Sequence, residues 1–191
     1  MKIKIGFFSV MLFLSLLLSH SYFALAAFLA VTLHELGHII VARLLKIQLN
    51  ECKIGIFGAA ISPTYFDFSY KDEILLCIGG PLMNIITAAF ALPFFSVTNN
   101  TVLLYFILSS VSLALLNLLP VNDFDGGRIL YSILCLFCDI NVADKSLSIC
   151  SFITVLILWF VSVYFLIIAS ANLSLFIFSL SLFFKLFVKG N

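Results

Sequence analysis

Long apolar stretches recur along the whole chain, and their length restricts the fold more than any other feature. A helix needs roughly 20 apolar residues to cross a bilayer, and six stretches approach or reach that length. They are Ile5–Ser19, Tyr22–Leu45, Ile74–Phe95, Thr101–Leu119, Leu147–Ile168 and Leu173–Val188. Residues Ile129–Cys138 are apolar but too few to span, which predicts a re-entrant or interfacial helix. The pattern predicts an all-α polytopic membrane protein with about six transmembrane helices.

The composition excludes several other classes of protein. Hydrophobic residues make up 63% of the 191 residues and charged residues only 10%, whereas a soluble domain carries about 25% charged residues. A water-soluble fold would therefore expose too much apolar surface. Ten basic against nine acidic side chains provide no basic field for nucleic acid. We expect a single transmembrane domain over residues 1–191, surrounded by the lipid bilayer and without a nucleic-acid partner.

The basic residues indicate the orientation of the chain. If the N-terminus is cytoplasmic, six spans place three uncharged loops outside, namely Ser19–Ser21, Ser96–Asn100 and Ser170–Asn172. All ten lysines and arginines then lie on or near the inner side, as the positive-inside rule requires. Both termini are therefore predicted to be cytoplasmic. A signal peptide ending at Ala24-Leu25-Ala26 is the alternative, but Tyr22–Leu33 continues as apolar helix without a polar cleavage region.

The segment Glu51–Tyr70 differs from the helical stretches. It is rich in Gly and β-branched residues around Ile54-Gly55-Ile56 and contains Pro63, which favours a strand pair or hairpin. Backbone of that kind at membrane depth must be buried in protein or line a wet cavity. We therefore expect a small membrane-embedded β-hairpin after the second span.

Residues His34-Glu35-Leu36-Gly37-His38 form an HExxH motif inside the second apolar stretch. The four-residue spacing puts both imidazoles on one helix face, where they can hold one zinc ion. Glu35 beside them can act as a general base toward water. An accidental motif is the alternative, but an acid inside a span costs roughly 2.5 kcal/mol or more. Three ionisable residues at ligand spacing therefore predict a metal site, roughly 12 Å of helix from Lys46 and within reach of the cytoplasmic side.

Two histidines leave zinc without a third protein ligand. The segment Asn117–Arg128, which ends the fourth stretch on the inner side, offers Asp123 and Asp125. Spacing alone does not choose between these two acids. A calcium loop is the alternative for the Asp-x-Asp-Gly pattern, but Arg128 and the apolar residues after it do not supply the later oxygen ligands.

Jointly, these motifs resemble the site-2 protease family of intramembrane zinc metalloproteases. The resemblance rests on the transmembrane HELGH, on Gly79-Gly80-Pro81 in the third stretch, and on an N-x-x-P-x-x-x-x-D-G-G motif that begins at Asn117. It covers about residues 22–130, the expected catalytic core, and leaves the spans within 147–188 as additions. The sequence departs mildly from the family pattern because Phe124 replaces a usual leucine.

The resemblance implies roles for individual residues. It implies one zinc ion per chain, held by His34, His38 and Asp125, with Glu35 as the catalytic residue. Asn117 and Asn84 are expected to bind substrate, because side-chain amides near zinc can hold a peptide backbone or steady an oxyanion. Hydrogen bonding to the backbone of a neighbouring helix is the alternative for either asparagine.

The resemblance also implies an activity, which is cleavage of a peptide bond within or next to a transmembrane segment of a membrane-embedded or membrane-associated protein. The six-span arrangement is most similar to the member that processes a pro-sigma factor during sporulation, although the CBS domain which that member typically adds is not expected here. This implies a bacterial inner or forespore-type membrane, access to the site from the cytoplasm, and room for an inhibitory membrane partner.

Two other functions remain as alternatives. One is a general minimal protease for signal-peptide remnants or peptide precursors. The other is a metal transporter or scaffold that uses His34 and His38 without hydrolysis. A transporter needs polar ligands across several spans, whereas the polar residues here cluster at one depth.

Overall fold

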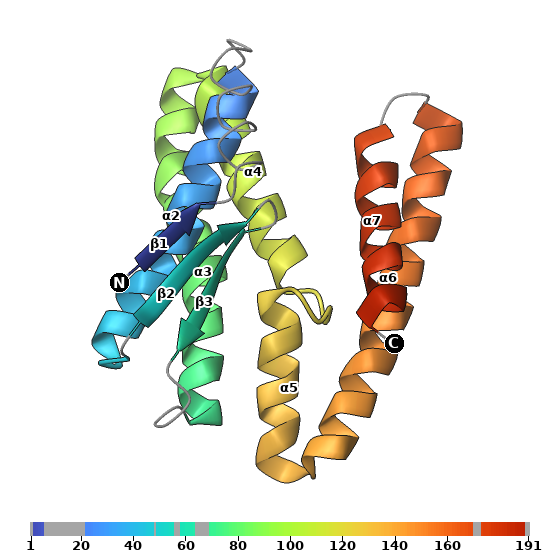
Figure 1. Ribbon diagram of the computed structural model, residues 1–191. Coiled ribbons are helices and arrows are strands. Elements are labelled where there is room, and N and C mark those ends of the chain that lie inside the picture. The colour runs from blue at the N-terminus through green and yellow to red at the C-terminus, as the bar shows by residue number, and fades with distance from the viewer. Residues whose placement is uncertain are drawn as a thin grey trace. The chain divides into compact units, whose positions relative to one another are not determined.

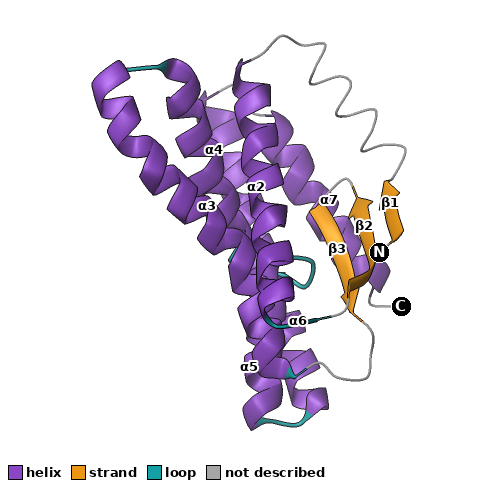
Figure 2. Ribbon diagram, turned by 90° about the vertical axis from the view of Figure 1, so that its left-hand side faces the viewer, coloured by secondary structure: helices purple, strands orange, loops and turns teal. Residues whose placement is uncertain are grey.

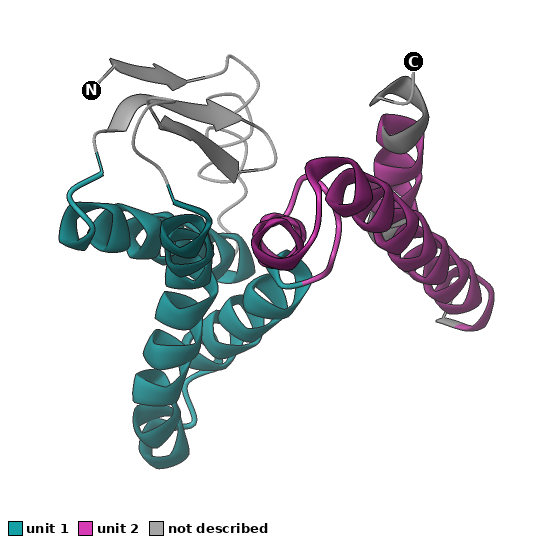
Figure 3. Ribbon diagram, turned by 90° about the horizontal axis from the view of Figure 1, so that it is seen from below, with its two compact units in different colours: residues 1–118 teal, residues 119–191 magenta. Residues whose placement is uncertain are grey.

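The computed structural model describes residues 2–5, 22–47, 49–55, 58–63, 69–169 and 173–189. The elements follow in the order β1 (Lys2–Ile5), α2 (Tyr22–Leu44), β2 (Leu49–Gly55), β3 (Gly58–Pro63), α3 (Tyr70–Thr98), α4 (Thr101–Asn117), α5 (Asp125–Phe137), α6 (Ile140–Ala169) and α7 (Leu173–Lys189) (Figure 1). The chain divides into two compact units, residues 1–118 and 119–191 (Figure 3). A single domain with its core at about 22–130 stays a prediction.

Among the described residues, three helices are long and apolar enough to cross a bilayer. They are Tyr22–Leu44, Tyr70–Thr98 and Ile140–Ile168, and the shorter apolar helices are Thr101–Asn117 and Phe176–Lys185. The first predicted span, Ile5–Ser19, lies outside the described residues apart from Ile5, which ends β1. The predicted helical membrane protein is confirmed to this extent, and the count of six spans stays a prediction.

Helix α3 begins earlier and ends later than the apolar stretch that predicted it. Ser69 caps its first turn, where the side-chain oxygen accepts from the backbone N–H of Lys71 at 3.3 Å. Asp72 and Glu73 in that turn favour the positive end of the helix dipole, so a polar turn can precede the apolar residues. At the other end Asn99 adopts the left-handed conformation, with φ of 49°, and its N–H bonds to the carbonyl of Phe95.

Helix α2 stops at a second left-handed residue, Lys46, whose φ is 56°. The N–H of Ile47 bonds to the carbonyl of Ala42 at 2.9 Å, and the N–H of Lys46 bonds to that of Arg43 at 3.1 Å. These two bonds form a Schellman motif, which satisfies carbonyls that the end of a helix otherwise leaves unpaired. The chain therefore leaves α2 at a defined point, eight residues after His38.

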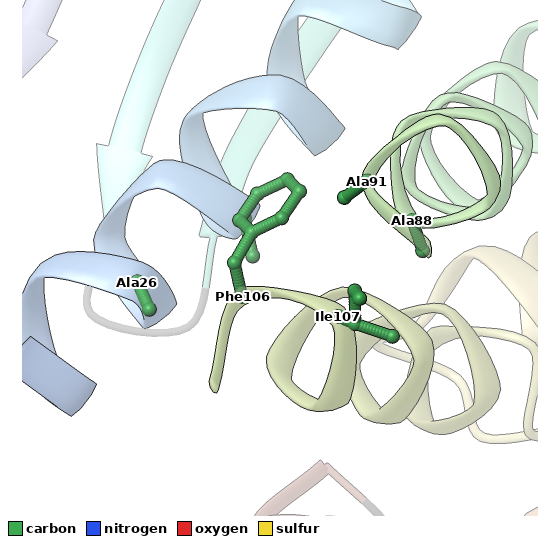
Figure 4. Packing of buried hydrophobic residues seen from close by; sticks show 6 residues of the cluster. Ala26, Ala88, Ala91, Phe106 and Ile107 are labelled. Carbon is green, nitrogen blue, oxygen red and sulfur yellow. The ribbon is translucent and has the colours of Figure 1, made fainter. Parts of the chain in front are cut away.

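Small residues let the helices of the first unit approach one another closely. Helices α2, α3 and α4 pack pairwise, and Figure 4 shows side chains from all three converging. The buried cluster consists of Ala26, Ala30, Ala88, Ala91, Phe106 and Ile107. Alanines on α2 and α3 bring the backbones together, and the two larger side chains of α4 fill the remaining space. Close packing of these helices fixes the position of the HExxH segment.

The strands form one three-stranded sheet in the order β1-β2-β3 (Figure 2). Strands β2 and β3 are antiparallel, with Cys52 opposite Ile61 and Gly55 opposite Gly58. Strand β1 pairs with β2 in parallel, with Lys2 opposite Glu51. Nothing in the sequence pattern predicted this strand. That a hairpin in this segment is embedded in the membrane stays a prediction.

In the second unit, the segment before α5 packs against α6 and α7. Buried Val121 and Phe124 from this segment contact Val155 of α6 and Leu182 of α7. The rings of Phe124 and Phe178 stack with their centroids 6.4 Å apart. Residues 119–124 are therefore part of the packed unit. The short helix predicted at Ile129–Cys138 corresponds to α5, whose 13 residues are too few to span.

Helix α6 begins seven residues before the predicted span Leu147–Ile168. The carbonyl of Asp139 accepts the N–H groups of Val142 at 2.9 Å and Ala143 at 3.0 Å, which starts the helix at Ile140. Ala143 is buried, while Asp144 and Lys145 are exposed. The first turns of α6 bury only one small side chain, so they need no run of apolar residues. A search for apolar residues alone therefore missed these turns.

Candidate metal centre

The two histidines of the HExxH motif face each other within the first unit. His34 is 4% exposed and His38 is 6% exposed, and their Nε2 atoms lie 3.2 Å apart. Two nitrogens that share a tetrahedral zinc ion at about 2.0–2.1 Å stand about 3.3–3.4 Å apart. The pair therefore fits a single zinc ion with a shift of only a few tenths of an ångström.

The proton of His38 is fixed by α3. Its Nδ1 lies 2.8 Å from the backbone oxygen of Leu76. A carbonyl oxygen only accepts hydrogen bonds, so Nδ1 carries the proton and Nε2 presents a lone pair toward His34. Metal-binding histidines commonly use a carbonyl in this way to set the tautomer and the ring orientation.

Asn84 of α3 lies against the other histidine. Its side chain is 0% exposed, and its Nδ2 lies 3.3 Å from Nδ1 of His34. The family resemblance implied that Asn84 binds the substrate. In the structure its neighbour is the imidazole of a predicted zinc ligand.

Gly80 leaves the space beside the two Nε2 atoms open. A Cβ at this position would overlap Nε2 of His38 and lie 2.7 Å from Nε2 of His34. The neighbouring Gly79 serves packing, since a Cβ there would lie 2.9 Å from the backbone oxygen of Gly37 on α2. The sequence singled out both glycines only as part of the family motif and did not distinguish their neighbours.

Glu35 and Asn117 are the other predicted site residues of the first unit. Glu35 follows His34 on α2 and is half-buried. Asn117 is the last residue of α4 and is also half-buried; its Nδ2 donates to the carbonyl of Leu113 at 3.2 Å, within its own helix. These contacts do not test the predicted catalytic role of Glu35 or the predicted substrate contact of Asn117, and both roles stay predictions.

The second unit holds the two aspartates that sequence spacing could not distinguish. Asp123 forms an ion pair with Lys185 of α7, with 2.9 Å between the carboxylate oxygen and Nζ. Asp125 is half-buried and is the first residue of α5, followed by buried Gly126 and Gly127. Because Lys185 already neutralises Asp123, Asp125 is the better candidate for a metal ligand.

Ser151 of α6 holds the segment before Asp125 and was not found by sequence reasoning. Its Oγ accepts from the N–H of Asn122 at 3.1 Å and lies 3.2 Å from the carbonyl oxygen of Pro120, to which it donates. The side chain is 0% exposed. A serine in an apolar stretch of α6 was the available signal, but this helix contains four serines, and such residues also bond within their own helix.

Part of the chain is similar to a known peptidase family. Residues 22–101 match the model of peptidase family M50. The match covers less than half of the chain, and over this segment the chain is similar to M50 peptidases. The segment contains the HExxH motif, Gly80 and Asn84, and the resemblance to intramembrane zinc metalloproteases that the motifs predicted is confirmed.

Two curated relatives are similar over part of their length. Stage IV sporulation protein FB of Bacillus subtilis is 31% identical over 121 residues, which is 62% of this chain and 42% of that protein. Zinc metalloprotease MJ0392 of Methanocaldococcus jannaschii is 34% identical over 113 residues, 56% of this chain and 32% of that protein. The chain therefore matches less than half of the length of either relative.

One solved structure supports the fold. The site-2 protease from Methanocaldococcus jannaschii has a TM-score of 0.66 at 22% sequence identity, covering 99% of this chain and 90% of that one. At this identity the likeness shows the fold alone. It is consistent with the helical architecture described above.

Proposed function

We propose that this protein is a zinc-dependent intramembrane endopeptidase that cleaves a peptide bond within or next to a transmembrane segment of its substrate. The observation that carries the proposal is the pair of buried Nε2 atoms, 3.2 Å apart, on the apolar helix α2. Burying two imidazoles among apolar side chains is costly unless they bind or pair with something. The match of residues 22–101 to peptidase family M50 supports the same function.

Zinc is the metal that this donor set fits. His34 and His38 would hold it through Nε2, and Asp125 would supply the third protein ligand, with one ion per chain. Two histidines and one carboxylate are a common ligand set in catalytic zinc sites, where a fourth position stays open. When bound, zinc polarises a peptide carbonyl and lowers the pKa of water.

Glu35 is the proposed general base. It would take a proton from the attacking water and pass it to the nitrogen of the leaving amine as the peptide bond breaks. It directly follows the proposed ligand His34 on α2, and its side chain is half-buried. Asn117 at the end of α4 is proposed to contact the substrate backbone.

The substrate must unwind locally, because a helix engages its carbonyl groups in hydrogen bonds. Strand β3 is an outer strand of the described sheet and contacts α2, the helix that carries the HExxH motif. We propose that an unwound substrate segment adds to this strand, since an outer strand offers unpaired backbone groups to an extended peptide.

The proposed substrate is a membrane-associated pro-sigma factor, and the similarity to a stage IV sporulation protein supports it. The site would then open to the cytoplasm of a bacterial inner or forespore-type membrane, with six spans and both termini inside. An inhibitory membrane partner would fit such a developmental role. The alternative within the class is a general protease for signal-peptide remnants or peptide precursors.

The test is co-expression with two tagged substrates, a pro-sigma factor and a signal-peptide remnant, followed by gel analysis. Three forms of the protein are compared: wild type, Glu35→Gln, and Glu73→Gln as a matched control at the start of α3. We expect a shortened product with the wild type and the control but none with Glu35→Gln. The substrate that is shortened decides between the two protease roles. Cleavage by Glu35→Gln would refute the proposed mechanism, and zinc transport that survives this substitution would favour a transporter.

A further inference from the structure

Ser151 links helix α6 to residues 119–124, the segment directly before the proposed zinc ligand Asp125. Its hydroxyl accepts from the backbone N–H of Asn122 at 3.1 Å and donates to the carbonyl oxygen of Pro120 at 3.2 Å. The side chain is 0% exposed. We infer that Ser151 is a positioning residue, which sets the place of Asp125 and thereby the affinity of the protein for zinc. This inference rests on the zinc site proposed above.

Ser151 differs from two other serines of α6 in the direction of its hydrogen bonds. Ser148 donates to the carbonyl of Asp144, and Ser162 donates to the carbonyl of Trp159, each within the helix itself. A serine in an apolar helix commonly satisfies its hydroxyl in this way. Ser151 instead bonds to groups that lie 29 and 31 positions away in the sequence. Both partners are backbone groups, so this hydroxyl fixes the path of the main chain.

Two closed turns transmit that path to Asp125. The N–H of Phe124 bonds to the carbonyl of Val121 at 2.9 Å, and the N–H of Gly127 bonds to the carbonyl of Phe124 at 3.1 Å. Gly127 also lets the first turn of α5 approach the segment closely, since a Cβ there would overlap the carbonyl oxygen of Val121. Asp125 lies within these turns, so a shift of the chain at residues 120–122 shifts its carboxylate as well.

Apolar packing holds the segment against the same helix. Val155 follows Ser151 by one turn of α6 and is also 0% exposed. It belongs to a buried cluster with Val121 and Phe124 of the segment, to which α7 contributes Leu182. Apolar packing is non-directional, whereas a hydrogen bond weakens steeply when its geometry is lost. The cluster therefore holds the segment on α6 and α7, and the bonds of Ser151 select one position within that contact.

A purely structural role is the alternative for Ser151, and Ser162 provides the matched control. Ser162 is also 0% exposed and lies on the same helix, and its Oγ is 2.9 Å from Oγ of Ser179 on α7. Replacement of either serine by alanine removes a buried hydrogen bond between two segments of the same unit, so both variants should lose stability. Only Ser151→Ala also loosens the segment that leads to Asp125.

The experiment measures the zinc affinity of the purified full chain in detergent by competition with a chelator. Loss of a residue that orients a metal ligand typically weakens binding about 10–100-fold. We expect such a loss for Ser151→Ala and an affinity within a few-fold of wild type for Ser162→Ala. In chains that already carry Asp125→Ala, adding Ser151→Ala should change the remaining affinity less than about threefold, because the ligand that Ser151 positions is gone.

Hydrogen exchange gives a second readout, which needs no variant. If docking of the segment on Ser151 favours zinc binding, zinc must favour that docking by the same factor, because coupling between two equilibria is reciprocal. The N–H of Asn122 should therefore exchange about 10–100-fold more slowly at saturating zinc. The N–H of Val142, which bonds to the carbonyl of Asp139 at the start of α6, is the control and should not respond.

Three outcomes would overturn the inference. They are an equal loss of zinc affinity in Ser151→Ala and Ser162→Ala, wild-type affinity in Ser151→Ala, and exchange at Asn122 that does not depend on zinc. Failure of the wild type itself to bind zinc would instead refute the proposed function. The two failures are thus distinguishable.

Discussion

The substitution Gly80→Ala should abolish zinc binding without unfolding the protein. A Cβ at residue 80 would overlap Nε2 of His38 and lie 2.7 Å from Nε2 of His34, in the space that a shared metal ion would use. The obstructing atoms belong to imidazole rings, which can turn aside, so the helix crossing itself is not forced apart. Alanine also favours a helix interior over glycine by about 1 kcal/mol. The metal-free variant should therefore be about as stable as the metal-free wild type.

The same substitution one residue earlier gives a matched control with a different outcome. In Gly79→Ala, the new Cβ would lie 2.8 Å from Cγ2 of Val41 and 2.9 Å from the backbone oxygen of Gly37. Both contacts press α2 and α3 apart, and overpacking of this kind typically costs about 1–3 kcal/mol. This variant should lose stability with and without zinc, but it should keep both ligand nitrogens accessible.

The assay is denaturant unfolding of purified protein in mild detergent, after removal of metal and again with zinc added. At a free zinc concentration of 100 times the dissociation constant, binding stabilises the folded wild type by about 2.7 kcal/mol. We expect this increment in the wild type and in Gly79→Ala, and no increment in Gly80→Ala at the same zinc concentration. A full zinc-dependent increment in Gly80→Ala would refute the assignment of the metal to the space beside Gly80.

Three other tests address the remaining parts of the site, two of them with a paired control substitution. Glu35→Gln should retain zinc, measured by metal analysis, while peptide cleavage falls below detection, because the proposed base is lost but no metal ligand is removed. Asp125→Ala should lose zinc affinity at least 100-fold in chelator competition. Asp123→Ala should keep its zinc affinity and lose less than about 1 kcal/mol of stability, because its partly exposed ion pair contributes little. An equal loss of zinc affinity in both variants would contradict the choice of ligand. Ser151→Ala should destabilise the protein by about 1–3 kcal/mol in denaturant unfolding, since it leaves the N–H of Asn122 and the carbonyl of Pro120 without this partner. Its control is Ser148→Ala, at an exposed position of the same helix, which should change stability by less than about 0.5 kcal/mol.

Hydropathy predicted which segments are helices better than it predicted where those helices begin and end. Apolar stretches located α2, α3, α4, α6 and α7, because burial in lipid or protein depends mainly on the number of consecutive apolar residues. They missed the polar first turns of α3 and α6, which are held by Ser69 and by the carbonyl of Asp139. They gave no indication of β1, since parallel pairing of Lys2 with Glu51 joins parts of the chain that are distant in sequence.

The sequence by itself determined the pair of histidines that is proposed to bind metal. His34 and His38 are one helical turn apart, and the helix repeat alone brings their side chains to one face, whatever surrounds them. The family motif likewise selected Asp125 and Glu35 without any knowledge of packing.

Only the tertiary structure decided what surrounds that pair. The crossing of α2 and α3 sets Leu76 and Asn84 beside the imidazoles and Gly80 beside their Nε2 atoms. Packing of α7 likewise brings Lys185 to Asp123, which gives one of the two aspartates an ion-pair partner. The physical reason is the range of the forces involved. Helix periodicity acts over four residues, whereas these contacts join residues up to several tens of positions apart and exist only where close-packed helices meet.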